Sequence, residues 1–276
     1  MTASLGKLLS DSWSSFRRAL MPILVGAVLF GLIMAIGQSF VGQRVAQKAG
    51  SVFENMGFDP QQMEDLQQRI QLGDETAMNE FAQQMEKLGG AEGEAMAGVV
   101  TSMYQGLLPM MGASMLIMWV ISLLASAYFL LISLDDKLTF QAALARTPKL
   151  IIPLFLLSLW VMIRSFVWIP VLGIIIAIIL GPRFVCAPLL LARDHKGVFE
   201  SASISYAKTR GYWGKIFGNM FVACLCAMVA VMVIGFVIGL LGTGTTGIIL
   251  PMVNMLATAF LTIFVVRLGT TILASA

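Results

Sequence analysis

Residues that catalyse reactions or hold metal ions are scarce in this sequence of 276 residues. It has one histidine, His195, which lies beside Asp194 in a polar segment, and its three cysteines lie inside apolar stretches. A buried free thiol behaves there as a small hydrophobic group. The adjacent carboxylates of Asp135 and Asp136 lack the further oxygen ligands that a cation needs, and no glycine-rich phosphate loop follows a strand pattern. We therefore expect no catalytic residue, no metal site and no cofactor, and we expect that the protein is not an enzyme.

Arg183 is a charged residue within an apolar stretch, and it is flanked by Pro182 and Pro188. If residues 171–192 span a membrane, Arg183 lies past the middle of the span. A charge at that depth costs roughly 2.5–3.5 kcal/mol and usually faces protein, water or a headgroup. One interpretation makes Arg183 a contact for an anionic lipid headgroup or substrate. The other starts the span nearer Phe166 and makes Arg183 an ordinary interfacial anchor. Both interpretations stay open.

The two prolines around Arg183 are candidate kink positions. Neither Pro182 nor Pro188 has an N–H, so in a helix they free the carbonyls of Ile178 and Phe184. A guanidinium has five N–H donors and is able to bond such carbonyls. The sequence therefore predicts a local distortion of the helix that the side chain of Arg183 relieves.

The polar segment 193–215 predicts a short surface helix. Its predicted apolar face consists of Val198, Phe199, Ala202 and Tyr206. Lys208 and Arg210 lie at the carboxyl end of this helix, where the helix dipole favours cations, and Gly211 supplies the cap. With Arg183, these two cations are candidate contacts for a headgroup or substrate. Asn254, in the last apolar stretch, is a further candidate polar position.

The elements that must position these residues follow from how the charges are distributed. Hydrophobic residues make up 58% of the chain and charged residues 12%, and the mean hydropathy is +0.86. There is no Asp, Glu, Lys or Arg between Glu94 and Asp135, and none between Lys215 and Arg267. Most of the protein is therefore surrounded by lipid. The net charge of +3 is small and the basic residues flank apolar runs, so we expect no nucleic-acid partner.

We predict an all-α polytopic bundle of about six membrane spans in one integral domain, residues 1–276. An amphipathic interfacial helix over residues 5–17 precedes the first span. The predicted spans are residues 20–40, 109–134, 150–168, 171–192, 216–241 and 248–267. The first apolar run is too long for the core of a signal peptide, which predicts an uncleaved span. Pro153 is expected in the first turn of the third span, and the turn at 242–247 is expected to reverse the chain before the sixth.

The acidic region 43–94 is the predicted insertion between the first two spans. Asp59-Pro60 starts one amphipathic helix, Gly73 ends it, and a second helix runs from near Asp74 to Gly89-Gly90. These helices form a predicted hairpin outside the cytoplasm. Their apolar faces either pack on each other and on the span ends or bind a protein partner.

The basic residues gather on alternate sides of the predicted spans. Three of the clusters surround Arg17, Lys149 and Lys208, whereas the predicted outer segments are poor in Lys and Arg apart from the acidic insertion. By the positive-inside rule, both termini and the interfacial helix at 193–215 are cytoplasmic. The oligomeric state does not follow from the sequence.

A set of short motifs carries a resemblance to a known family. The motifs are Trp168-Ile-Pro-Val-Leu-Gly173, Gly181-Pro-Arg-Phe184, Ala187-Pro188, Phe199-Glu-Ser-Ala202, Lys208-Thr-Arg-Gly211-Tyr-Trp213 and Phe217-Gly218. The chain resembles bacterial six-span membrane proteins related to the membrane domain of glycerophosphoryl diester phosphodiesterases. The likeness covers about residues 168–218, and the acidic region 43–94 departs from it. It implies a six-span helical fold, without a phosphodiesterase catalytic domain after the spans.

The sequence thus predicts a non-catalytic integral protein of the bacterial inner membrane. Its expected role is that of an envelope- or lipid-associated scaffold or accessory protein, with membrane lipids and their anionic headgroups as partners. The alternative is a small permease for an anionic or lipid-like substrate, with Arg183, Pro182, Pro188 and Asn254 along its path. A lipid-modifying enzyme is a third, weaker interpretation.

Overall fold

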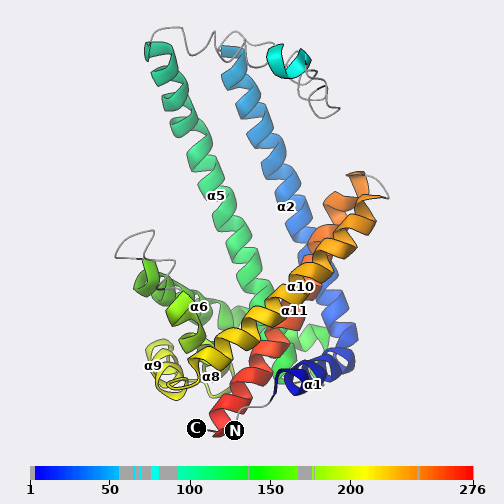
Figure 1. Ribbon diagram of the computed structural model, residues 1–276, viewed down its shortest axis with the longest axis vertical. Helices are drawn as coiled ribbons and strands as arrows, with labels where there is room; N and C mark the ends of the chain where they lie inside the picture. The colour runs from blue at the N-terminus through cyan, green and yellow to red at the C-terminus, as the bar shows by residue number, and fades with distance from the viewer. Residues whose placement is uncertain are drawn as a thin grey trace. The chain divides into compact units, whose positions relative to one another are not determined.

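The protein is all-α in the computed structural model, which describes residues 4–55, 65, 69, 76–80, 93–135, 137–166, 176, 178–240 and 243–275. Within these residues there is no β-strand. The helices are α1 (Leu5–Arg18), α2 (Leu20–Asn55), α5 (Gly93–Leu134), α6 (Phe140–Phe166), α8 (Ala187–Arg193), α9 (Val198–Lys208), α10 (Trp213–Gly239) and α11 (Thr243–Ser275), with a 3-10 helix η1 (Gly181–Phe184) before α8 (Figure 1).

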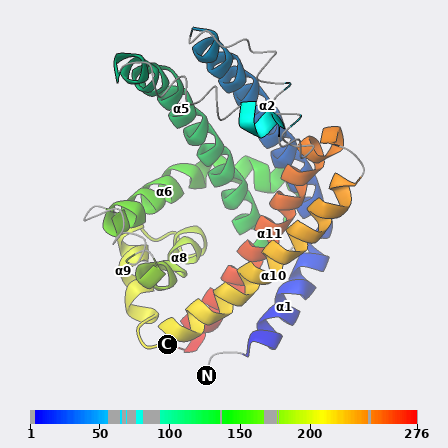
Figure 2. The ribbon, with the colours of Figure 1, turned by 45° about the horizontal axis from the view of Figure 1, so that its top comes forward.

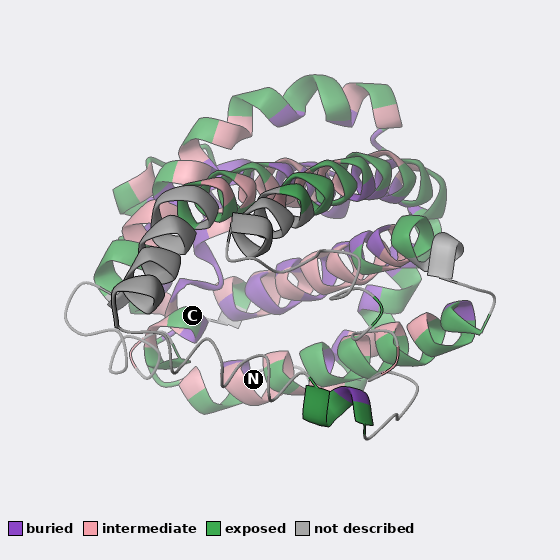
Figure 3. Ribbon diagram, turned by 90° about the horizontal axis from the view of Figure 1, so that it is seen from above, coloured by how far each residue is buried: buried purple, intermediate pink, exposed green. Residues whose placement is uncertain are grey.

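In the described part of the chain, five helices are long and apolar enough to cross a membrane. They are Leu20–Val45, Leu108–Leu134, Phe140–Arg164, Trp213–Gly239 and Gly247–Ala274. Burial is greatest on the inward sides of the helices, and exposed residues run along the long ones (Figure 3). Exposed apolar faces suit contact with lipid rather than water. The chain is therefore a multi-pass membrane protein, and the predicted all-α polytopic bundle is confirmed.

The chain divides into two compact units, residues 36–119 and the remainder. In the first, α2 runs to Asn55, beyond the predicted end of its span, and α5 starts at Gly93 as one helix that continues through Pro109. The residues that precede the predicted span start at Pro109 thus belong to the same helix. Leaving the helix would expose unpaired backbone groups, which apolar surroundings penalise.

Only parts of the predicted acidic hairpin lie among the described residues. There, Arg69 Nη1 is 3.2 Å from Glu80 Oε2, and Arg69 Nη2 donates to Thr76 Oγ1 at 3.3 Å. Residues 76–80 are helical. These contacts tie one half of the predicted hairpin to the other. The predicted caps at Asp59-Pro60 and Gly73, and the surface for a protein partner, lie outside the described residues.

In the second unit, the start of α2 packs against the end of α5 and the middle of α11. Tyr128 of α5 is fully buried, and its hydroxyl donates to the Pro22 carbonyl at 2.6 Å. A Cβ at Gly31 would lie 2.7 Å from the Met252 Cα, so only glycine allows this approach of α2 to α11. The missing side chain of Gly31 thus permits close contact between these two helices.

The predicted amphipathic helix at the N-terminus is α1, and it packs against α11. Leu8 and Phe16 are buried, and the rings of Phe16 and Phe260 are 6.0 Å apart in an edge-to-face arrangement. Arg267 Nη2 donates to Ser15 Oγ at 2.6 Å. The apolar stripe of α1 thus covers the C-terminal half of the last helix.

Helix α6 differs from the predicted third span, because it starts at Phe140 rather than near Leu150. The Ala142 N–H donates to Thr139 Oγ1 at 3.3 Å, which caps the helix. Arg146 and Lys149, predicted in a loop, are therefore helical, and Pro153 lies well inside the helix instead of in its first turn. Near the end of α6, the Arg164 guanidinium lies over the Trp160 ring, 6.0 Å from its centroid.

Helices α10 and α11 lie side by side (Figures 1 and 2). A Cβ at Gly235 would lie 3.3 Å from Leu250 Cδ1, so this glycine serves packing within the chain. The turn between them is shorter than predicted, because residues 243–247 already belong to α11. Helix α6 points away from this pair and packs against α8 and α9 (Figure 2).

Candidate functional site

The predicted fourth span is broken where its two prolines stand. Residues 181–184 form η1, a turn follows at Val185 and Cys186, and the seven-residue α8 begins at Ala187. Pro182 and Pro188 both lie in the first turn of their short helices, where the missing N–H leaves no hydrogen bond unmade. The predicted span over residues 171–192 is therefore not one regular helix in its described part, because it is interrupted next to both Pro182 and Pro188.

Side chains of α9 and α10 bond the backbone groups that the break exposes. Ser205 Oγ donates to the Arg183 carbonyl at 2.8 Å and accepts from the Cys186 N–H at 3.2 Å. Thr209 Oγ1 lies 3.2 Å from the same carbonyl. Trp213 Nε1, at the start of α10, donates to the Ile179 carbonyl at 2.9 Å. Hydroxyl groups and an indole therefore replace the hydrogen bonds that a continuous helix would make.

The buried face of α9 is consequently polar, which corrects the predicted apolar face. Ser201, Ser205 and Thr209 are fully buried, while Phe199 is 67% exposed. Of the predicted apolar face, Ala202 is the residue that is buried. Hydropathy assigned the wrong side because Ser205 and Thr209 on the buried face bond backbone groups, which apolar side chains cannot do.

The guanidinium of Arg183 lies over the Tyr206 ring, 4.8 Å from its centroid. Its Nε is buried and has no hydrogen-bond partner in the described part of the chain. The prediction that this side chain bonds the carbonyls of Ile178 and Phe184 is therefore wrong. The carbonyls that accept bonds are those of Ile179 and of Arg183 itself.

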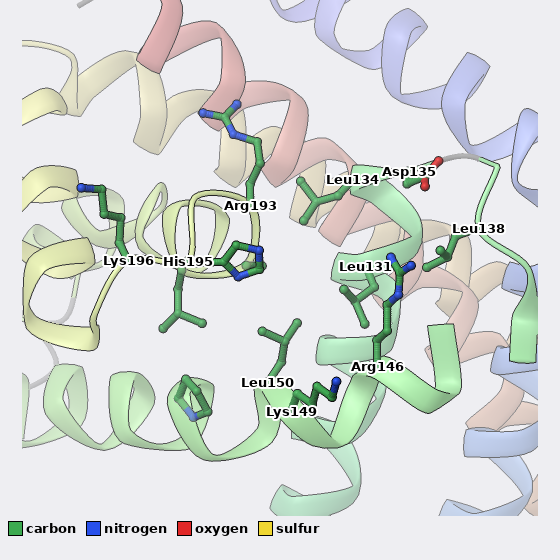
Figure 4. Close-up of a pocket in the computed structure, with 13 residues that line it drawn as sticks. Leu131, Leu134, Asp135, Leu138, Arg146, Lys149, Leu150, Arg193, His195 and Lys196 are labelled. Carbon is green, nitrogen blue, oxygen red and sulfur yellow. The ribbon is translucent and has the colours of Figure 1, made fainter. Parts of the chain in front are cut away.

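A cavity of about 570 Å³, here called the basic cavity, opens where α5 ends, α6 begins and α8 ends (Figure 4). Apolar residues from all three elements form part of its lining. The charged and polar lining residues are Asp135, Arg146, Lys149, Arg193, His195 and Lys196. In Figure 4, Arg146 and Lys149 rise from α6, and His195 faces Lys149 across the cavity.

Two of the lining cations are already paired with carboxylates. Arg193 Nε is 2.8 Å from Asp194 Oδ1, and this hydrogen bond lowers the pKa of the Asp194 carboxyl below its usual value. Lys196 Nζ is 2.6 Å from Glu200 Oε1, and that hydrogen bond raises the pKa of Lys196. For Arg146 and Lys149, no described carboxylate lies within 4.0 Å. These two cations therefore give the cavity its available positive charge.

The connection from α8 to α9 places His195 at the cavity. His195 has a φ of 52°, in the left-handed region that residues other than glycine seldom adopt. The turn directs the chain away from the end of α8, and both His195 and Lys196 line the basic cavity. Gly211, with a φ of 88°, lies in the turn that follows α9, whose C-cap is Thr209 and not the predicted Gly211.

A second cavity of about 750 Å³, here called the apolar cavity, lies among α5, α6, η1, α8, α10 and α11. Its lining is mostly leucine, valine, methionine and phenylalanine side chains. Four lining residues carry hydroxyls, namely Ser126, Ser158, Thr258 and Thr262. Pro188 also lines this cavity.

The other predicted site residues lie apart from both cavities. Lys208 is half-buried at the end of α9, Arg210 is exposed in the following turn, and Pro182 is buried in η1. Asn254 is exposed on α11, and its carbonyl accepts from Thr258 Oγ1 at 2.8 Å within the same helix. Arg183, Lys208 and Arg210 are not among the residues that line the basic cavity.

The sequence reasoning missed Arg146 and Lys149 because it placed both in a loop. The signal that could have found them is Thr139, a good N-cap residue, which precedes Arg146 by about two helical turns and Lys149 by about three. Helical spacing from Thr139 onward would have put both cations on the first turns of α6, beside the end of α5.

Comparisons with protein-family models, with curated proteins and with solved structures gave no match. The resemblance to membrane domains of glycerophosphoryl diester phosphodiesterases therefore stays a prediction. Among the described residues, no group of three or more His, Cys, Asp and Glu side chains is placed to hold a metal ion.

Proposed function

We propose that this chain is a non-catalytic protein of the bacterial inner membrane that binds an anionic lipid headgroup in the basic cavity. The observation that carries the proposal is the pair Arg146 and Lys149, which lines a cavity without a described carboxylate partner. A guanidinium and an ammonium together suit a phosphate group. In this role the protein serves as a lipid-associated scaffold or accessory protein.

The position of the cavity supports a lipid rather than a soluble anion. It lies where the apolar helix α5 ends at Leu134 and α6 begins at Phe140, and therefore at the level expected for headgroups. Basic residues on the cytoplasmic side attract the anionic lipids of that leaflet. In this orientation, which the positive-inside rule favours, both termini are cytoplasmic.

Thermal unfolding in detergent tests the proposal with four additions: phosphatidylglycerol, phosphatidylcholine, glycerol phosphate and inorganic phosphate. A ligand that binds only the folded state raises Tm, and at 100 times its Kd it stabilises by about 2.7 kcal/mol. We expect phosphatidylglycerol to raise the Tm of the wild type by several degrees and the other three to change it little. A shift from the free phosphates as large as that from the lipid would identify a soluble anion as the ligand.

A pair of matched variants assigns the effect to the cavity. The Arg146→Gln/Lys149→Gln variant should lose the phosphatidylglycerol shift. The control Lys7→Gln/Lys215→Gln, which removes two exposed cations outside the basic cavity, should keep it. An equal shift in both variants would contradict the proposal.

The break in the fourth apolar stretch favours one alternative, a small permease, because discontinuous helices line many transport sites. Of the predicted path residues, Pro188 lines the apolar cavity, whereas Arg183 stacks on Tyr206 and Asn254 is exposed on α11. Flux of glycerol phosphate into proteoliposomes, abolished by Arg183→Ala, would favour the permease over the lipid-binding protein.

A further inference from the structure

Both cavities are lined by α5, by α6 and by η1 with α8. Along each of these three walls, the basic cavity lies nearer the helix end and the apolar cavity lies farther in. Along α5, the apolar cavity is lined up to Leu130 and the basic cavity from Leu131 onward. Along α6, the basic cavity ends at Pro153 and the apolar cavity begins at Leu154. Each wall thus passes from charged residues near the helix end to apolar residues farther in.

The third wall, η1 with α8, repeats this order. Leu189 lines the apolar cavity, and the basic cavity follows with Leu191, Ala192, Arg193, His195 and Lys196. Helices α10 and α11 contribute only to the apolar cavity, for example through Met220 and Leu261. Charged residues therefore line the cavity near the helix ends, and apolar residues line the cavity farther in. That polarity matches a molecule with an anionic head and a hydrocarbon chain.

The hydroxyls of the apolar cavity do not make it polar, because most of them bond to their own helices. Ser158 Oγ donates to the Phe155 carbonyl at 2.9 Å, and Thr262 Oγ1 donates to the Thr258 carbonyl at 2.8 Å. Thr258 makes the same kind of bond to the Asn254 carbonyl. Their protons are not available to a ligand, so the lining suits hydrocarbon better than a polar solute.

We infer that one anionic lipid occupies both cavities, with its headgroup at Arg146 and Lys149 and an acyl chain in the apolar cavity. This inference rests on the proposed function and specifies its ligand as a chain-bearing amphiphile. Each cavity is within the roughly 300–1,000 Å³ of small-molecule sites. The acyl chain stays in apolar surroundings when it moves from the bilayer into the apolar cavity. Selectivity for the lipid therefore comes from the headgroup, and the apolar cavity orients the acyl chain.

Photo-crosslinking tests where the tail lies. The probe is phosphatidylglycerol with a diazirine in the middle of an acyl chain, added to the full-length protein in phosphatidylcholine liposomes. We expect crosslinks to concentrate on the cavity residues of α6 and α11, such as Leu157 and Thr262. The exposed face of α10, at Phe221, Met228 and Met232, reports contact with bulk lipid in the same sample.

Two variants make the result decisive. Arg146→Gln/Lys149→Gln should lower the cavity crosslinks about tenfold and leave those on the α10 face unchanged. Ser158→Phe should fill part of the apolar cavity and lower the cavity crosslinks to a similar degree. Its control is Ile163→Phe, which adds the same ring to the exposed side of α6 and should have no effect.

Cavity crosslinks no stronger than those of the α10 face would overturn the inference. If phosphatidylglycerol still raises the Tm selectively in that case, the headgroup site of the proposed function stands without a bound tail. If Arg146→Gln/Lys149→Gln keeps the selective Tm shift, the proposed function itself fails, and the inference fails with it.

Discussion

The helices around Tyr128 and the region from α6 to α9 are built in opposite ways. Around Tyr128, helices α2, α5 and α11 stay continuous and approach closely, because Gly31 lets backbone meet backbone. From η1 to α9 the chain forms short helical pieces, and side chains such as Ser205 bond the exposed backbone. The first arrangement fills its interior, whereas the second leaves two cavities. In this protein both cavities thus lie beside the interrupted helix.

The largest expected effect is in the continuous region. Gly31→Ala places a methyl group 2.7 Å from the Met252 Cα, so α2 and α11 must separate. Overpacking of this kind costs typically 1–3 kcal/mol, and unfolding in mixed micelles of a mild detergent and sodium dodecyl sulfate measures it. Gly42→Ala is the control in the same helix, because its Cβ meets nothing within 4 Å. Equal stability of the two variants would refute the close approach.

A smaller, local effect is expected in the broken region. Ser205→Ala removes the donor to the Arg183 carbonyl and leaves the Cys186 N–H without its acceptor. The expected loss is about 1 kcal/mol, typical of one hydrogen bond in a membrane protein or slightly more. Hydrogen exchange at Cys186 should accelerate. Ser203→Ala, on the exposed side of α9, should change neither quantity; unchanged exchange in Ser205→Ala would show that the hydroxyl does not cap the break.

The smallest effect is expected at the edge of the basic cavity. The hydrogen bond from Arg193 lowers the pKa of Asp194 in the folded protein. The pair therefore stabilises the folded protein at pH values above about 3.9, the pKa of an aspartate in the unfolded chain. This stabilisation is lost as the pH falls through the lowered pKa. Asp194→Asn should therefore reduce Tm slightly at pH 7, and this difference should shrink as the pH falls below the unfolded pKa of about 3.9. A difference that grows toward low pH would contradict the ion pair.

The sequence predicted the membrane helices because their apolar runs are longer than any soluble core requires. It placed the end of α2 before its actual end at Asn55 and the start of α6 after its actual start at Phe140. Both helices continue into polar residues, which a hydropathy pattern does not show. The kinks at Pro182 and Pro188 were predictable from proline chemistry. Their partner was not, because Ser205 is remote in sequence and its role depends on how α9 docks.

The basic cavity was beyond the reach of sequence patterns for a related reason. Arg146, Lys149 and His195 come from two segments that tertiary packing brings together. The candidates chosen from the sequence, Arg183 and Lys208, were selected for their depth or for the helix dipole. Neither criterion reports whether a cation has a carboxylate partner, and that property distinguishes Arg146 and Lys149 from Arg193 and Lys196.

Native mass spectrometry tests the central claim, that the basic cavity holds an anionic lipid, most directly. The protein is released from micelles that contain equal amounts of phosphatidylglycerol and phosphatidylcholine, and the retained lipid is counted for each variant. The wild type and Lys7→Gln/Lys215→Gln should retain more phosphatidylglycerol than phosphatidylcholine. In Arg146→Gln/Lys149→Gln, the ratio of retained phosphatidylglycerol to phosphatidylcholine should fall about tenfold. Equal retention of the two lipids by the wild type, or an unchanged preference in Arg146→Gln/Lys149→Gln, would contradict the account.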